Sequence, residues 1–235
     1  MTEDRRLQTG DWTDHRGVAI ILVLLAMMLL SVLGMALALT SSSERQVAAT
    51  YGWSTEVFYG ADAAFERAAQ DLSQVPDWNL VLNGGTSTFV DGVPGQRTLP
   101  DGSVLNLAQA TDAVNCGRSP CSFADLQATT ARRPWGTNNP IWRLYAYGTL
   151  ADFSPSAAID SNVYVVVWVA DDPLETDGLP LIDGETTSGP NPGAGLLQVL
   201  VHAYGPSGTR RVIEATLGRT PRIRVLSWRE LRQPN

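Results

Sequence analysis

The sequence contains no lysine, only two histidines and only two cysteines. With so few imidazoles and thiols, the sequence argues against a histidine-based catalytic triad, a multi-histidine metal site and a four-thiolate zinc site. All of its 17 basic side chains are arginines, and the net charge at pH 7 is −7. This acidic balance argues against nucleic acid as a partner of the chain as a whole.

The two cysteines, Cys116 and Cys121, lie in CGRSPC, a spacing too wide for a CxxC redox pair. Behind an export-type N-terminus, this arrangement favours a short disulfide loop formed in an oxidising compartment. Two free buried thiols are the alternative. Closing so small a loop contributes at most roughly 2–3 kcal/mol, so the bond would mainly shape the loop.

The charge is distributed unevenly along the chain. Residues 76–209 carry 13 acidic side chains and 5 arginines, whereas residues 210–235 carry 7 arginines and 2 acidic side chains. The basic tail includes Arg219, Arg222, Arg224, Arg229 and Arg232. We expect a solvated edge strand whose charge discourages aggregation, with DNA, anionic lipid or an acidic neighbouring subunit as alternative contacts.

The longest apolar run, from Val18 to Leu39, has neither charge nor proline. Its length of about 22 residues would span roughly 33 Å as a helix, which is enough to cross a bilayer. A cleaved secretory signal is the alternative, because arginines precede the run and Ala36-Leu37-Ala38 has the small-x-small form of a cleavage site. A signal's hydrophobic region usually covers about 7–15 residues, so the length favours a retained membrane helix.

The next segment, residues 41–75, has no proline, and its apolar residues recur at helical spacing. They are Val47, Tyr51, Phe58, Ala61, Phe65, Ala68, Leu72 and Val75. The pattern predicts that the helix continues beyond the membrane. We expect Phe58, Phe65 and Leu72 to be buried against a sheet.

Beyond Val75 the sequence is rich in glycine, proline and asparagine, which is typical of loops and short strands, and the helical pattern ends. A weak strand is expected at 103–107 and a short helix at 122–130 with Ser122 as N-cap. Clearer alternating runs follow at 142–150, 163–170, 196–204, 210–217 and 222–228. The turn GPSGT predicts a hairpin between 196–204 and 210–217. The fold class is therefore α+β, a long N-terminal hydrophobic and amphipathic helix packed on an antiparallel sheet.

Three features of the N-terminal third resemble the type IV pilin-like proteins, specifically the PilX-type minor pilins. They are a short polar leader ending in Gly17, an apolar helix that starts directly after it, and an amphipathic extension ending FYGADAAFERAAQDL. The resemblance implies that a prepilin peptidase cuts after Gly17 and methylates Val18. It also implies that the helix is both an inner-membrane anchor and the part that packs into the filament with other minor and major pilins.

One departure from the pilin pattern bears on function. In major pilins the mature chain usually begins with Phe or Met, and its fifth residue is a Glu that neutralises the N-terminus of a neighbouring subunit. Here these positions are Val18 and Leu22. Leucine cannot form that ion pair, and an unpaired ammonium group in an apolar bundle is costly. A subunit with no neighbour above it avoids this cost, so Leu22 predicts a priming or tip role.

An acidic loop, DDPLETDGLPLIDGE, follows the strand expected at 163–170. Its oxygen donors at Asp171, Asp172, Glu175, Asp177 and Asp183, with Glu185 at the end of the loop, are of the kind that binds Ca²⁺. The spacing is not that of an EF-hand. A calcium site is one interpretation, and a solvated acidic turn without any cofactor is the other.

The expected organisation is a cleaved leader at 1–17, a membrane and filament-core helix at 18–40, an amphipathic extension at 41–75 and a sheet domain at 76–235 with a basic C-terminal tail. The expected function is that of a minor pilin in pilus assembly or priming, with adhesion as an added role of the displayed loops. The protein would reside in the inner membrane before assembly and in the periplasm and extracellular pilus afterwards. A type II secretion pseudopilin, and an anchored or exported ligand-binding protein, are the alternatives. No motif indicates an enzyme, and the lone His202 in a strand is expected to be structural.

Overall fold

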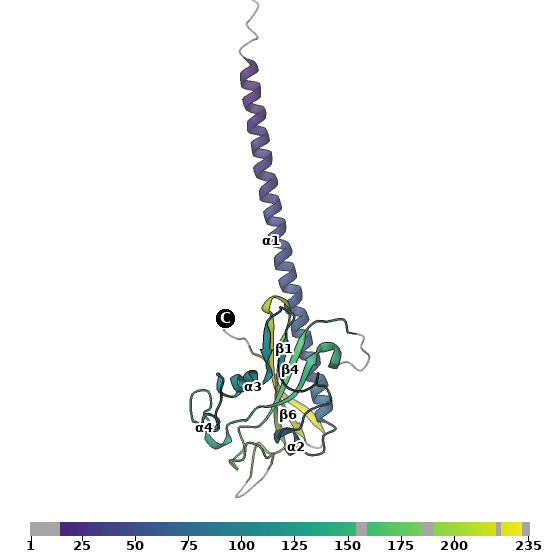
Figure 1. Cartoon of the computed structure of the whole chain (residues 1–235), viewed down its shortest axis with the longest axis vertical. Helices are drawn as coiled ribbons and strands as arrows, with labels where there is room; N and C mark the ends of the chain where they lie inside the picture. The colour runs from purple at the N-terminus through teal and green to yellow at the C-terminus, as the bar shows by residue number, and fades with distance from the viewer. Residues whose placement is uncertain (1–14, 154–158, 185–189, 220–221, 232–235) are drawn as a thin grey trace, which may run out of the picture. The chain divides into compact units, whose positions relative to one another are not determined.

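The computed structural model describes residues 15–153, 159–184, 190–219 and 222–231 (Figure 1). The chain divides into two compact units, residues 1–51 and residues 52–235, and the helix α1 (His15–Leu72) contributes to both. Of the expected leader, residues 1–14 lie outside the described part.

In the first unit the described residues are entirely helical. The segment is rich in alanine, leucine and methionine, which are strong helix formers, and it lacks proline. Its side chains from Gly17 to Thr50 are exposed apart from half-buried Ala49, so no packing within this unit stabilises the helix. The helix is therefore stabilised by its intrinsic helix propensity and by whatever apolar environment contacts its surface.

The second unit is built on a five-stranded antiparallel sheet in which spatial order follows chain order, β3-β4-β5-β6-β7. Its strands are β3 (Arg143–Thr149), β4 (Tyr164–Asp171), β5 (Leu196–Tyr204), β6 (Arg210–Arg219) and β7 (Ile223–Glu230). The expected hairpin is confirmed, because β5 and β6 pair in register from Leu196 with Gly218 to Tyr204 with Arg210. The α+β class and the antiparallel sheet expected from the alternating runs are therefore correct.

Shorter elements complete this unit. A two-stranded antiparallel sheet pairs β1 (Gln96–Thr98) with β2 (Val104–Asn106), and the second of these is the weak strand expected at 103–107. The helices are α2 (Asn79–Leu82), α3 (Leu107–Cys116) and α4 (Phe123–Gln127), with single 3-10 turns at η1 (Gly136–Asn138), η2 (Leu150–Phe153) and η3 (Pro206–Gly208). The short helix expected at 122–130 is α4, whereas α2 and α3 were not expected from the sequence.

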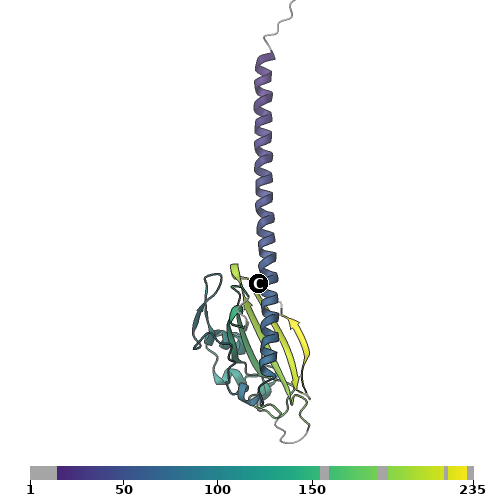
Figure 2. The ribbon, with the colours of Figure 1, turned by 90° about the vertical axis from the view of Figure 1, so that its right-hand side faces the viewer.

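The end of α1 packs on one face of the sheet (Figure 2). Its buried residues recur at helical spacing and include Val57, Ala61, Ala64, Phe65, Ala68 and Leu72. The β4 residues Val165, Val167 and Val169 belong to the same core, because alternate residues of a strand share a face. The opposite face is covered by α3, whose Leu107 packs with Trp168 of β4 in a second core.

Two details of the expected helix need correction. The buried stripe runs through Val57 rather than Phe58, which is half-buried and contacts the edge of the Trp228 ring at a centroid distance of 6.1 Å. Val47 and Tyr51, also expected on the stripe, are 66% and 75% exposed. The helix itself ends at Leu72, three residues before the expected Val75, and the chain leaves it through hydrogen-bonded turns.

The first edge of the sheet is covered by an extended segment. Ser87 N–H donates to Tyr145 C=O at 2.9 Å, and Asp91 N–H donates to Tyr147 C=O at 3.1 Å. Tyr147 N–H in turn donates to Phe89 C=O at 3.1 Å. Part of the outer edge of β3 therefore has backbone partners, as a sheet edge needs if it is not to pair with another chain.

Candidate functional site

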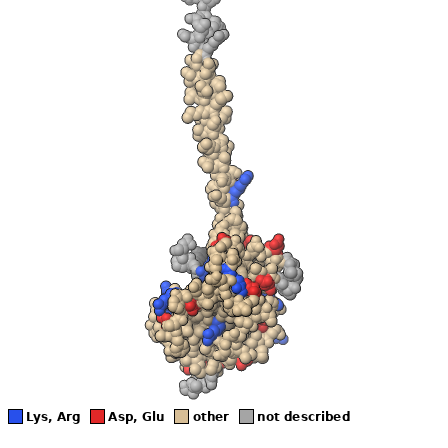
Figure 3. All heavy atoms as spheres, in the orientation of Figure 1, with Lys and Arg blue, Asp and Glu red and all other residues tan. Residues whose placement is uncertain are grey.

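The first candidate site is the apolar surface of α1. From Val18 to Ser43 the helix carries no charged side chain, and Figure 3 shows this stretch as an uninterrupted uncharged surface. Among the described residues, α1 is long and apolar enough to cross a membrane, and the most hydropathic part of it is entirely unburied. Such a surface is stable only in lipid or against other apolar helices.

The residues expected to matter for processing and assembly lie at the start of this surface. Gly17 and Val18 fall within α1, which begins at His15, and both are exposed. Leu22 lies about one turn further along the helix and its side chain is 61% exposed. An exposed leucine adds to the apolar surface at the position where a glutamate would have interrupted it.

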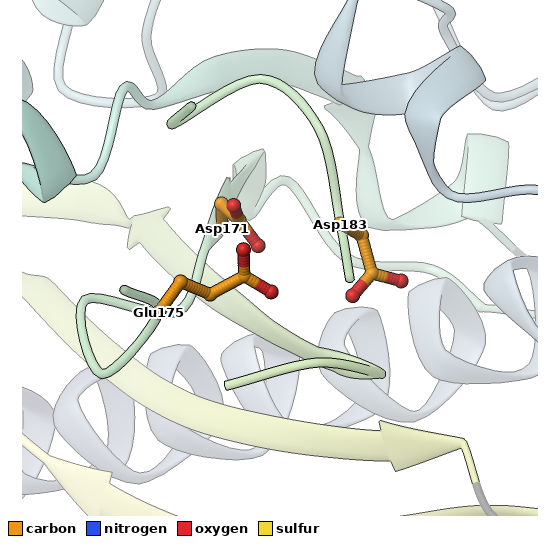
Figure 4. A group of neighbouring side chains, drawn as sticks. All are labelled: Asp171, Glu175 and Asp183. Atoms are coloured by element: carbon orange, nitrogen blue, oxygen red, sulfur yellow. The ribbon is translucent and has the colours of Figure 1, made fainter. Parts of the chain in front are cut away.

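The second candidate site is a group of three carboxylates in the sheet unit (Figure 4). Asp171 ends strand β4, where it pairs with Leu197 of β5, so the sheet holds it in place. Glu175 and Asp183 come from the irregular connection between β4 and β5. One carboxylate oxygen from each of the three lies within 4.8 Å of the other two.

The two deepest members of this group have unused oxygens. Asp171 and Glu175 are only 2% and 3% exposed. Asp171 Oδ1 accepts from Asp172 N–H at 3.0 Å, and Glu175 Oε1 accepts from Gly184 N–H at 3.0 Å. Their second oxygens, Oδ2 and Oε2, are buried and have no hydrogen-bond partner among the residues that the structure describes. A buried carboxylate in this state is costly unless a proton or a cation joins it.

Burial sets the electrostatics of the group. Removal from water, together with the neighbouring charge of Glu175, raises the pKa of Asp171 to about 9. Burial also raises the pKa of Glu175 to about 7, and that of Asp183 is raised for the same reason. Positive charge nearby opposes this effect at Asp183, because the Arg219 guanidinium favours its ionised form.

Not all the acidic residues named from the sequence belong to the group. Asp172 is buried, but its Oδ1 accepts from Leu174 N–H at 2.9 Å, as in a turn. Asp177 Oδ1 likewise accepts from Leu179 N–H at 2.9 Å. The structure therefore brings oxygens of Asp171, Glu175 and Asp183 together. Asp177 lies beside this group and acts on Glu175 without being a member, and Glu185 lies outside the described residues.

One further residue shapes the group and was missed from the sequence. A Cβ atom at Gly193 would lie 2.5 Å from Cγ of Glu175 and 2.7 Å from its backbone nitrogen. Only glycine permits this approach of the returning chain. The contact joins positions far apart in a loop, so no local pattern in the sequence marks it.

The cysteine loop joins α3 to α4. A disulfide links Cys116, the last residue of α3, to Cys121. The next residue, Ser122, caps α4, with its Oγ accepting from Asp125 N–H and the Asp125 carboxylate accepting from Ser122 N–H. The bond thus holds the end of one helix beside the start of the next.

Two arginines of the basic tail make contacts within the sheet unit. Arg219 donates to the backbone carbonyls of Val75 and Pro76, and its guanidinium lies 4.4 Å from the Trp78 ring centroid. Arg229 pairs with Glu214 across the strands at 2.6 Å. Arg222 and Arg224 are exposed, and Arg232 lies outside the described residues. Intramolecular pairing of this kind favours the structural interpretation of the tail.

His202 is buried in strand β5, on the sheet face that α3 covers. It lines a pocket of about 540 Å³ with Glu214 and residues of α3. Its Nδ1 lies 2.7 Å from Arg210 Nη2 and 3.3 Å from the Tyr204 hydroxyl. Because a guanidinium only donates, Nδ1 must accept from it. Burial, and then the charge of Arg210, holds the pKa of His202 well below 6.5, so the ring is neutral.

Comparison with known proteins gives one match. Residues 16–66 match the family model described as PilX N-terminal. No curated protein matches the chain. No solved structure matches it either.

Proposed function

We propose, from the match of residues 16–66 to the PilX N-terminal family model, that the chain is a PilX-type minor pilin that primes pilus assembly and resides at or near the filament tip. The observation that carries this proposal is the family match at residues 16–66, read together with Leu22 at the usual glutamate position. In this role the protein works by assembly, without catalysis.

The proposed pathway begins in the inner membrane, where the apolar part of α1 is the anchor. Prepilin peptidase cuts after Gly17 and methylates the new N-terminus at Val18. The apolar surface then leaves lipid for the helical bundle of the filament, where it contacts other minor and major pilins. Both environments match an uncharged helix surface from Val18 to Ser43.

The tip position follows from the ion pair that Leu22 cannot make. In a shaft, the methylated ammonium group of each subunit needs a carboxylate from a neighbour, because an unpaired charge in an apolar bundle is strongly unfavourable. A tip subunit provides its own N-terminus to the subunits below without receiving one. The sheet unit is then displayed at the filament end, where its loops meet any adhesive ligand.

The mature N-terminus tests the class of protein. Mass spectrometry of the chain from its native host is expected to find methylated Val18. A chain that starts at Leu39 would mean signal peptidase cleavage, and one that starts at Met1 or Thr2 would mean a plain anchor. Either of these results overturns the pilin proposal.

The tip position needs its own experiment. The substitution Leu22→Glu restores the usual carboxylate, and is expected to increase the number of tagged subunits along isolated pili. Leu25→Glu is the matched control, because it places the same charge one turn away, where no ion pair is expected. If Leu22→Glu and wild type are distributed alike along the filament, the argument from Leu22 fails.

A further inference from the structure

We propose that Asp171, Glu175 and Asp183 form a calcium site that fastens the β4–β5 connection to the sheet. The inference concerns the sheet unit alone and does not depend on the pilin role. It rests on convergence of three carboxylates within 4.8 Å and on the two buried oxygens that have no partner among the described residues. Figure 4 shows the carboxyl groups of Asp171 and Glu175 turned toward one another, with Asp183 across from them.

The donor set selects the type of cation. All three ligands are carboxylates, which favour hard cations such as Ca²⁺ and Mg²⁺ over zinc or copper. Three carboxylates provide up to six oxygens when each binds through both, within the six to eight that calcium takes. Magnesium demands near-ideal octahedral geometry and usually retains several waters with one or two carboxylates. Three carboxylates on an irregular connection therefore fit calcium better.

The charge around the site favours a divalent cation. The three carboxylates together carry three negative charges when ionised, and calcium supplies two positive charges. The Arg219 guanidinium offsets part of the remainder at Asp183, whereas Asp77 and Asp177 add negative charge there. Without the ion, a proton takes its place, because burial and the neighbouring Glu175 disfavour the ionised form of Asp171.

Each ligand is attached to a different part of the sheet unit, which gives the ion its structural effect. Asp171 belongs to β4, and Glu175 lies in the turn that follows and packs against Gly193. Asp183 accepts from Gly195 N–H at 2.6 Å, just before β5, and its own N–H donates to Asn79 of α2 at 2.7 Å. An ion bound by all three would therefore cross-link the strand end, the connection and α2.

Calcium binding is tested with the full chain in detergent micelles, first stripped of metal with a chelator. Titration calorimetry is expected to give one calcium ion per chain. At a calcium concentration 100-fold above Kd, the Tm is expected to rise by about 5–10 °C over the value in chelator. Hydrogen exchange in residues 172–184 and 190–195 should slow on addition of calcium. The proposal is overturned if the wild-type chain binds no calcium at millimolar concentration.

Substitutions test whether calcium binding requires these three side chains or only the negative charge of the protein. Asp171→Asn and Glu175→Gln should each lose calcium binding and the calcium-dependent rise in Tm. In chelator, both should melt no lower than the wild type, because each replaces a buried carboxyl group that is costly to ionise with a neutral group of nearly the same shape. Asp160→Asn, an exposed position, changes the net charge equally and should bind calcium like the wild type. Calcium binding that survives both ligand substitutions would refute the site.

Two further measurements make the result decisive. If either ligand variant does not fold, Asp183→Asn replaces it, since this side chain is only half-buried and its substitution disturbs the core least. Magnesium at the same concentration is expected to raise the Tm by less than half the calcium shift. An equal shift with magnesium would overturn the assignment to calcium.

Discussion

The burial of Phe65 leads to a direct test of how α1 is attached to the sheet. Phe65 is 1% exposed and belongs to the core between α1 and the sheet. Its replacement by alanine removes a buried ring and leaves a cavity, a change that costs about 3–5 kcal/mol in closely packed cores. The neighbours Ala61, Ala64 and Ala68 are too small to fill the space.

The size of the effect follows from the length of the chain. For domains of this size, about 1 kcal/mol corresponds to a change in Tm of about 2–4 °C, so Phe65→Ala should lower the Tm of the sheet unit by about 6–20 °C. Near-ultraviolet circular dichroism of the full chain in detergent micelles reports this transition, because the tryptophans Trp78 and Trp168 are buried in the sheet unit. The calcium concentration must be the same in all samples.

Tyr59→Ala is the matched control for Phe65→Ala. It also removes an aromatic ring from α1, but Tyr59 is 64% exposed, and its ring contact is with Phe58 in an edge arrangement at 5.5 Å. The expected cost is at most about 1 kcal/mol. If the two variants melt at the same temperature, the end of α1 does not pack on the sheet as described, and the reasoning from the buried stripe fails.

Three further predictions concern the sheet unit. Burial lowers the folded-state pKa of His202 below 6.5, so the unfolded chain takes up the proton first as the pH falls. The free energy of unfolding should therefore decrease below that pH. Urea unfolding at about pH 7.5 and about pH 5.5 should show that His202→Gln removes this part of the pH dependence. A Cβ at Gly205 would lie 2.2 Å from Val57 Cγ2, so Gly205→Ala should cost about 1–3 kcal/mol by overpacking. The cost should fall when Val57→Ala is added, and additive costs in thermal unfolding would contradict the contact. Cys116→Ser should lower the free energy of unfolding by at most roughly 2–3 kcal/mol, and a reducing agent should then have no further effect on its Tm.

The elements predicted well from sequence are those whose pattern reflects burial. The alternating runs became β3 to β7. In β4, β5 and β6, one set of alternate residues lies in the core with α1 and the other set contributes to the core with α3, whereas β7 is exposed along most of its length. Ser122 was identified correctly as a cap, because its hydrogen bonds are local. The long helix was also predicted correctly, because residues 41–75 contain no proline and keep a helical period throughout.

The helix α3 was missed because its residues include threonine, asparagine and aspartate, which are poor helix formers. Two local signals do mark it. Asn106 Oδ1 accepts from Ala108 N–H and Gln109 N–H at the start, and Gly117 at the end has a φ of 70°, where glycine is favoured. Attention to both caps, rather than to composition, would have found the helix.

The membership of the carboxylate group could not be predicted from sequence. The sequence identifies an acidic segment, but which side chains converge depends on the path of the connection between β4 and β5. That path is set by contacts between distant residues, such as Gly193 against Glu175 and Asp183 against Asn79. Asp172 directly follows Asp171 and Asp177 lies two residues after Glu175, yet the carboxylate of each accepts a backbone hydrogen bond within a local turn.

The two edges of the sheet, β3 and β7, differ because an extended segment covers part of β3. Along β3, the backbone groups of Tyr145 and Tyr147 are already bonded to residues 87–91. In the described part of the sheet, β7 has a neighbouring strand only on its β6 side, so a strand from another molecule would extend the sheet along β7. There it would meet exposed Arg224 and Arg229 as well as exposed Leu226. The sheet can therefore be extended at its β7 edge and not along the covered part of β3. The added strand would fit best if it carried acidic side chains opposite the arginines and apolar side chains opposite Leu226.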